Sequence, residues 1–257
     1  MRKNLIILIF FLSAIFLVLL FLNFNKSYLS NKSGKIDRVD KADNQKSPRK
    51  ISRGPVQFFG LLGALGKVIF YEKSDSIVYE ASFDGSGKKE LARIPGASEI
   101  VFNPVKQSLI AAINQSGKTK KFYFDLGNSQ KTEVNPNAEN FVFSPDGTKL
   151  AYFSRGLGLD EKNISLSNPD GSDFKVLLKT RIKDLAIIWP EENLIVFYSK
   201  SQENPLVFSV SPETGKIQKL APEKLASFLE SSNKKNPLKD YSVFISQEDG
   251  KLYSLRE

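Results

Sequence analysis

The chain has 257 residues, enough for one large domain or two small ones, and 41% of them are hydrophobic. It contains neither cysteine nor histidine. Disulfide bonds and lipid attachment through cysteine are therefore excluded, and the commonest general base and transition-metal ligand is missing. The net charge is +9, of which residues 1–53 carry +8 and residues 54–257 only +1. Since the globular part is nearly neutral, we expect no specific nucleic acid as a partner.

The N-terminal segment has the pattern of a membrane anchor. Residues 4–25 carry no charge, and Leu5–Leu22 is apolar except for Ser13. As a helix, 22 residues span about 33 Å, enough to cross the hydrocarbon core of a bilayer. This predicts a short flank at residues 1–3 and a transmembrane helix at residues 4–25, which would contact the lipid. A cleaved signal peptide is the alternative, but its apolar region is typically shorter and ends in a small-x-small site, which 22–28 does not offer.

Residues 26–53 are rich in Lys, Ser, Asn and Asp, which predicts a basic flexible linker without stable structure. The positive charge of the linker favours a cytoplasmic location for the C-terminal side of the anchor, whereas Arg2 and Lys3 favour a cytoplasmic N-terminus. Large C-terminal domains cross the membrane largely regardless of flanking charge. We therefore expect a single-pass protein of the cell membrane whose C-terminal domain is extracytoplasmic, with a cytosol-facing domain as the alternative.

From residue 54 onward the pattern is that of β-hairpins. Val68–Tyr71 and Ile77–Tyr79, for example, are short apolar runs on either side of a polar turn. Four similar pairs follow: 109–113 with 122–124, 150–153 with 164–166, 194–198 with 206–208, and 243–245 with 252–255. Residues 221–240 are the weakest stretch, in which we expect a helical turn at 225–229 and a loop at 231–239.

Two series of turn residues recur with a common period. Strands end at Pro104, Pro145 and Pro190, which are 41 and 45 residues apart. A second series of turns begins at Asp84, Asp125, Asp170 and Glu213, at spacings of 41, 45 and 43 residues. Four strands in 40–45 residues is the signature of one blade of a β-propeller.

The best copy of this unit is Phe143-Ser144-Pro145-Asp146-Gly147-Thr148-Lys149-Leu150-Ala151-Tyr152, followed by Ile164-Ser165-Leu166 and Pro169-Asp170-Gly171-Ser172. It resembles the repeat of TolB-like β-propellers, which is also found in the propeller domains of dipeptidyl-peptidase-IV-type and prolyl-oligopeptidase-type enzymes. The match is close only over residues 140–183. The neighbouring units have Val105-Lys106 and Glu191-Glu192 in place of Asp-Gly. The resemblance implies the architecture, and it implies no function because it consists of turn and packing residues.

We therefore predict an all-β domain at residues 54–257, a β-propeller of about five four-stranded blades. The expected blades are 60–98, 99–139, 140–183, 184–223 and 224–257. Because the last of these lacks an outer strand, an early strand such as Val56–Phe59 is expected to complete it; an incomplete ring is the alternative.

The residues argue against catalysis. A Ser-His-Asp triad is impossible without histidine, and there is no Gly-x-Ser-x-Gly motif. The regularly placed aspartates, such as Asp146 and Asp170, each precede a glycine and are interpreted as turn residues. Structural turn roles are assigned to Pro104, Pro145, Asp146, Gly147, Asp170, Gly171 and Pro190. We expect no enzyme activity, no cofactor and no metal site.

Two features stand outside the repeat. The loop 155–163 is the longest connection inside a regular blade, and its Arg155, Leu157, Leu159 and Asp160 are candidate binding residues, with a tolerated insertion as the alternative. Trp189, the only tryptophan, is either an exposed partner anchor or a residue buried between blades.

Together these features predict a membrane-anchored propeller of a bacterial cell envelope. It would act as a non-enzymatic scaffold that binds an envelope protein or a cell-wall polymer. A carboxylate-based glycan-processing enzyme is the alternative function.

Overall fold

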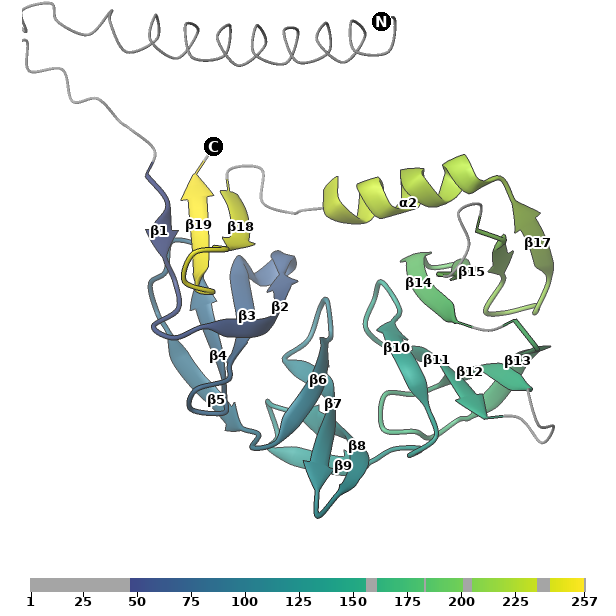
Figure 1. Cartoon of the computed structure of the whole chain (residues 1–257), viewed down its shortest axis with the longest axis horizontal. Coiled ribbons are helices and arrows are strands. Elements are labelled where there is room, and N and C mark those ends of the chain that lie inside the picture. The colour runs from purple at the N-terminus through teal and green to yellow at the C-terminus, as the bar shows by residue number, and fades with distance from the viewer. Residues whose placement is uncertain (1–46, 156–160, 183, 201–204, 235–240, 257) are drawn as a thin grey trace, which may run out of the picture. The chain divides into compact units, whose positions relative to one another are not determined.

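The computed structural model describes residues 47–256 except for 156–160, 183, 201–204 and 235–240 (Figure 1). The predicted transmembrane helix at 4–25 and the first part of the predicted linker lie outside the described residues. Within the described part, no helix has the length and apolar character needed to span a bilayer.

Four sheets each contain four antiparallel strands that pair in the order of the sequence, as the repeat predicts. The first sheet contains β2 (Val56–Leu62), β3 (Lys67–Glu72), β4 (Ile77–Ser82) and β5 (Lys89–Arg93), with the 3-10 turn η1 (Gly63–Leu65) after β2, and the second contains β6 (Ala97–Phe102), β7 (Ser108–Gln115), β8 (Lys118–Asp125) and β9 (Gln130–Glu133). The third sheet contains β10 (Glu139–Phe143), β11 (Leu150–Arg155), β12 (Lys162–Ser167) and β13 (Lys175–Thr180). The fourth sheet contains β14 (Leu185–Glu191), β15 (Leu194–Ser199), β16 (Val207–Val210) and β17 (Ile217–Leu220).

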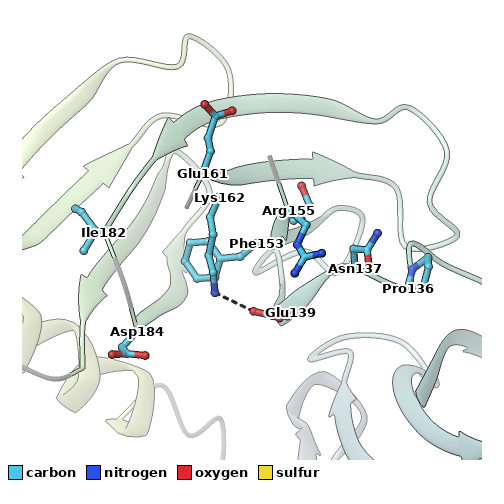
Figure 2. A pocket seen from close by; sticks show the side chains of 10 residues that line it. Pro136, Asn137, Glu139, Phe153, Arg155, Glu161, Lys162, Ile182 and Asp184 are labelled. Carbon is cyan, nitrogen blue, oxygen red and sulfur yellow. Dashed lines mark hydrogen bonds and ion pairs between the residues drawn. The ribbon is translucent and has the colours of Figure 1, made fainter. Parts of the chain in front are cut away.

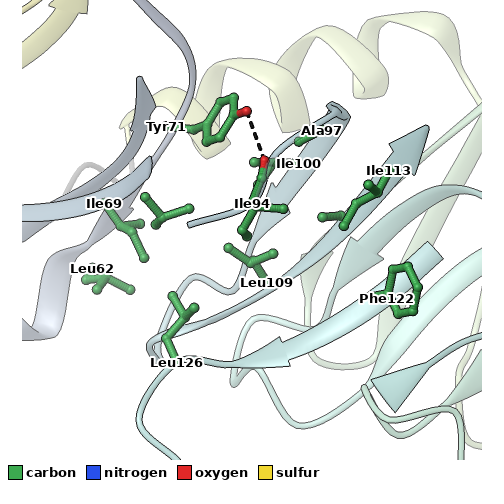
Figure 3. Packing of buried hydrophobic residues seen from close by; sticks show 12 residues of the cluster. Leu62, Ile69, Tyr71, Ile94, Ala97, Ile100, Leu109, Ile113, Phe122 and Leu126 are labelled. Carbon is green, nitrogen blue, oxygen red and sulfur yellow. Dashed lines mark hydrogen bonds between the residues drawn. The ribbon is translucent and has the colours of Figure 1, made fainter. Parts of the chain in front are cut away.

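The core lies between the sheets because the second strand of each is buried on both faces. In β11, Ala151 and Phe153 pack against the fourth sheet, whereas the alternate residues Leu150 and Tyr152 pack against the second. The same alternation in β3 and β7 fills the interface between the first and second sheets, whose cluster includes Ile69, Leu109 and Phe122 (Figure 3). The two-residue period of a strand thus delivers successive side chains to two different interfaces.

Consecutive sheets also meet through their first strands: β2 contacts β6, β6 contacts β10, and β10 contacts β14. The approach is closest at Gly60 of β2, where a Cβ atom would lie 2.7 Å from the Cβ of Phe102 in β6. A series of four-stranded antiparallel sheets, packed face to face and joined through their first strands, is the arrangement of a β-propeller.

The fifth sheet has three strands, in the order β1 (Arg49–Lys50), β19 (Leu252–Arg256) and β18 (Tyr241–Ile245). A strand from the beginning of the domain does pair with the C-terminal strand, but it is not Val56–Phe59. Those residues belong to β2 and pair with β3. The strand β1 lies in the stretch predicted as a linker, so residues 47–53 are part of the fold. Its two charged, exposed residues gave no apolar alternation from which a strand could be predicted.

The segment after β1 is fixed by a buried carboxylate. Glu72 of β3 is 2% exposed, and its side chain accepts hydrogen bonds from the backbone N–H groups of Arg53 (3.0 Å) and Gly54 (3.1 Å). The Lys88 ammonium lies 2.5 Å from the same carboxylate. Beside it, Ile51 and Ser52 are buried and bonded to Leu252 of β19. The N-terminal end of the domain is therefore attached to both the first and the fifth sheets.

The helix α2 (Pro222–Lys234) follows β17. It is longer than the single helical turn predicted at 225–229, and it includes the first part of the predicted loop 231–239. Pro222 is the first residue of the helix. Backbone N–H groups in the first turn of a helix have no acceptor within the helix, so a proline there costs no hydrogen bond. Leu225 of the helix packs against Val196 and Val207, on the face of the fourth sheet opposite the third sheet. On that face a helix occupies the position that a further sheet would take.

The predicted turn residues lie in turns or bends, except for Pro190, which belongs to β14. Gly147 has φ +68°, and the side chain of Asp146 accepts hydrogen bonds from Ser144 Oγ (2.5 Å) and from Thr148 N (3.1 Å) and Oγ1 (2.7 Å). Burial alone would raise the pKa of Asp146, but these hydrogen bonds outweigh it and hold the pKa below its ordinary value.

The turn at Asp170-Gly171 is built in the same way. Gly171 has φ +88°. The hydroxyl and the backbone N–H of Ser172 both donate hydrogen bonds to the Asp170 carboxylate. These bonds lower the pKa of Asp170, and the bond from the hydroxyl has the larger effect. Pro190 lies instead at an irregularity in β14, between Ile188 and Glu191.

Candidate functional site

A pocket of about 430 Å³ lies where the third and fourth sheets meet (Figure 2). Residues at the end of β11 and the start of β12 form one side, and residues before β10 and β14 form the other. The lining residues are Pro136, Asn137, Glu139, Phe153, Ser154, Arg155, Glu161, Lys162, Ile182 and Asp184. The volume falls in the range of small-ligand sites.

Asn140 and Asp184, which both have positive φ angles, fix the backbone on the side of the pocket formed by the segments at β10 and β14. Asn140, beside Glu139, has φ +53°, and its side-chain amide donates to the carbonyl of Leu185, beside Asp184, at 2.9 Å. This hydrogen bond joins the third sheet to the fourth directly next to the pocket. Asp184 has φ +51°, and its carbonyl accepts a hydrogen bond of 2.8 Å from the backbone N–H of Lys200. Asn and Asp tolerate this left-handed conformation better than most residues do.

The pocket contains charges of both signs. The Lys162 ammonium lies 3.0 Å from the Glu139 carboxylate, and Glu161 pairs at 3.6 Å with Lys179, which lies on β13. Arg155 and Asp184 are exposed and have no ion-pair partner among the described residues. The ring of Phe153 supplies a buried apolar surface. Such a lining suits a polar ligand that carries charge.

The carboxylates do not form a free acid–base pair. Glu139 is paired with Lys162 at 3.0 Å, whereas Glu161 Oε1 lies 3.6 Å from the Lys179 ammonium and has no hydrogen-bond partner among the described residues. Asp184 is the one lining carboxylate without an ion pair in the described part of the chain. The described residues also contain no group of three or more Asp and Glu side chains that could hold a metal ion.

The structure separates the residues that the sequence singled out. Arg155 lines the pocket, whereas Leu157, Leu159 and Asp160 lie outside the described residues. Trp189 is 8% exposed, packs in the core between the third and fourth sheets, and donates from Nε1 to the carbonyl of Glu192 at 3.3 Å. Of its two interpretations, the buried one is correct.

Sequence reasoning missed Glu139, Lys162 and Asp184, and with them the role of Asn140. Lys162 lies inside the loop 155–163, although it is not among the candidate residues named there. The others lie on segments that meet only when two sheets pack, and the positive φ angles of Asn140 and Asp184 have no marker in a sequence without glycine at those positions.

No model of a known protein family matches the chain, and no curated protein sequence matches it. Solved structures are similar at low identity. A TolB-type protein from Agrobacterium tumefaciens is 13% identical, with 65% of this chain and 67% of that one covered and a TM-score of 0.46. TolB from Acinetobacter baumannii is 13% identical, with 66% and 55% covered and a TM-score of 0.36.

An acylaminoacyl peptidase from Pyrococcus horikoshii is 12% identical, with 64% of this chain and 31% of that one covered and a TM-score of 0.48. The chain thus spans between about a third and two thirds of the length of these proteins. They belong to the groups named by the sequence resemblance, TolB and peptidases with propeller domains. With TM-scores below 0.5, they support no conclusion about what this chain binds or does.

Proposed function

We propose that the chain is a membrane-anchored β-propeller that binds an envelope protein or a cell-wall polymer without catalysis, outside the cytoplasmic membrane. The pocket between the third and fourth sheets is its contact site. The observation that carries the proposal is the pair of opposite, unmatched charges, Arg155 and Asp184, in a pocket of ligand size.

The position of the pocket supports a binding role. It adjoins both ends of the connection between β11 and β12, since Arg155 and Glu161 flank residues 156–160. Loops mounted on a rigid scaffold are common binding elements, because the scaffold fixes their ends at little entropic cost. Here the ends of the loop are fixed by the pairing of Arg155 with Lys162 in the β11–β12 hairpin.

The alternative of a glycan-processing enzyme would need two carboxylates placed to act as acid and base or nucleophile. The pocket does contain three carboxylates. Glu139 lies 3.0 Å from the Lys162 ammonium, whereas Glu161 Oε1 lies 3.6 Å from the Lys179 ammonium and has no hydrogen-bond partner among the described residues. The opposite charges of Arg155 and Asp184, which have no ion-pair partner in the described part of the chain, support binding as the function of this pocket.

The test is photo-crosslinking of the full chain in its own membrane. A crosslinking amino acid replaces Asn137, which is exposed at the pocket, and in a matched control it replaces Thr132, which is exposed on β9 of the second sheet. We expect adducts from position 137 and none from position 132. A discrete band would indicate a protein partner, and a smear removed by a muramidase would indicate wall polymer. Equal yields at the two positions, or none at either, would overturn the proposal.

The proposed topology is tested separately. A reporter that is active only in the cytoplasm is fused to the C-terminus of the full chain, and a periplasmic or extracellular reporter is fused in a parallel strain. Activity of the cytoplasmic reporter alone would show a cytosol-facing domain and refute the extracytoplasmic assignment.

A further inference from the structure

The charged residues of the pocket indicate which class of ligand it binds. This inference rests on the docking role proposed above and goes beyond it by naming the ligand class. Lys162 pairs with Glu139, and Glu161 lies 3.6 Å from Lys179, with no hydrogen bond to its Oε1 among the described residues. Arg155 and Asp184 are the lining cation and anion that have no ion pair in the described part of the chain. In Figure 2 these two side chains lie on opposite sides of the Lys162–Glu139 pair. A ligand that matched both would carry a carboxylate at one end and an ammonium group at the other.

Each group is suited to its half of such a ligand. The guanidinium of Arg155 can donate two parallel hydrogen bonds to a carboxylate, a geometry that a lysine cannot reproduce. A carboxylate such as Asp184 accepts several hydrogen bonds from an ammonium group, which has three donors. Between the two ends, the Lys162–Glu139 pair has no net charge, and the Phe153 ring and the Ile182 side chain contribute apolar surface.

The separation of the two charges is built into the fold. Arg155 is the last residue of β11, in the third sheet, and Asp184 directly precedes β14, in the fourth. The hydrogen bond from Asn140 to the Leu185 carbonyl ties these sheets together beside Asp184. Asp184 has φ +51°, a left-handed conformation that aspartate tolerates better than most residues, and its carbonyl accepts a hydrogen bond of 2.8 Å from the backbone N–H of Lys200, which fixes its position.

We propose that this pocket binds a peptide segment that carries a free ammonium group and a carboxylate a few residues apart, with Arg155 holding the carboxylate and Asp184 holding the ammonium group. A peptide fits the volume of about 430 Å³. Its backbone amides can form hydrogen bonds with the Asn137 side chain, and its apolar side chains can contact Phe153 and Ile182.

The test uses the full chain in lipid nanodiscs and three tripeptides, observed by saturation-transfer NMR. The probes are trialanine with free termini, its N-acetylated form and its C-amidated form. Because a hydrogen bond to a charged group contributes more than 1 kcal/mol, we expect blocking either terminus to weaken binding about tenfold. Equal binding of the three peptides would overturn the proposal, and so would no binding of any.

Two variants assign the ends of the ligand. In Arg155→Gln, the free and C-amidated peptides should bind equally, while N-acetylation should still weaken binding. In Asp184→Asn, which keeps a residue suited to the left-handed backbone, N-acetylation should make no difference, while C-amidation should still weaken binding. Lys120→Gln, which removes an exposed pair with Glu133 on the second sheet, is the control and should behave as the wild type does. The same response in both pocket variants would refute the assignment of ends.

The outcome is distinguishable from that of the docking proposal. Crosslinked adducts from position 137 without binding of the free tripeptide would leave the docking function standing and remove the ligand class. Tripeptide binding with the expected variant pattern but without adducts would support the ligand class and overturn the docking function.

Discussion

Replacing Gly147 by alanine tests how adjacent sheets are joined. The Asn103 side chain, at the end of the second sheet's first strand, is 1% exposed and donates from Nδ2 to the Gly147 carbonyl at 2.9 Å. Its Oδ1 accepts from the backbone N–H groups of Val105 (2.9 Å) and Lys106 (3.0 Å). A Cβ atom on residue 147 would lie 2.2 Å from Oδ1 and 2.8 Å from Nδ2, so Asn103 must move.

The expected destabilisation has two parts. An alanine at φ +68° costs about 1–2 kcal/mol because of its left-handed conformation. Displacing Asn103 breaks the buried hydrogen bond from its Nδ2 to the Gly147 carbonyl, at about 1–3 kcal/mol. The control is Gly117→Ala, where φ is +79° but nothing lies within 4 Å of the new Cβ, so only the first part applies. We therefore expect Gly147→Ala to lose about 1–3 kcal/mol more stability than Gly117→Ala.

Urea unfolding of the full chain measures this difference, with the fluorescence of the single, buried Trp189 as the signal. In an Asn103→Ala background the obstacle is gone, and Gly147→Ala should then cost only the conformational part, as Gly117→Ala does. If Gly147→Ala and Gly117→Ala destabilise the wild type equally, or if the cost of Gly147→Ala is the same in both backgrounds, the Asn103 link does not hold the sheets as described.

Three further predictions concern the fold. Glu72→Gln should cost about 3 kcal/mol in urea unfolding because it leaves the Lys88 charge unmatched, whereas Glu133→Gln, in an exposed pair, should cost at most about 0.5 kcal/mol; similar losses would contradict this. Gly60→Ala should cost about 1–3 kcal/mol by forcing β2 away from β6, and an unchanged unfolding midpoint would refute that contact. Because the pKa of Asp170 is lowered in the folded state, the unfolded chain binds more protons than the folded chain as pH falls below about 4, and the free energy of unfolding decreases there. Asp170→Asn should make this decrease smaller. An unchanged dependence of the free energy of unfolding on pH between about pH 2 and 5 would contradict the prediction.

The repeat was readable because its chemistry is local. Alternating residues such as Leu150 and Phe153 reveal a strand, and turns such as Asp170-Gly171 require particular residues at particular positions. With two turn series at a period near 43, these signals were enough to predict the four regular sheets and their order. The pocket was not readable in the same way. Of its lining residues, the sequence indicates only Arg155, in the loop 155–163.

The sequence by itself determined the local structure: strands, turns, their repetition and a neutral domain preceded by a basic segment. The need to close the last sheet predicted that an early strand would pair there, but only the tertiary structure decided which distant segments meet. It placed the charged strand β1 against β19, some 200 residues away in the sequence. After β1, the backbone N–H of Arg53 donates a hydrogen bond to the Glu72 carboxylate. The tertiary structure also set α2 against the fourth sheet and brought Asp184 to the same pocket as Arg155. These contacts depend on side chains that pair across sheets, and no periodic pattern along the chain encodes such pairing.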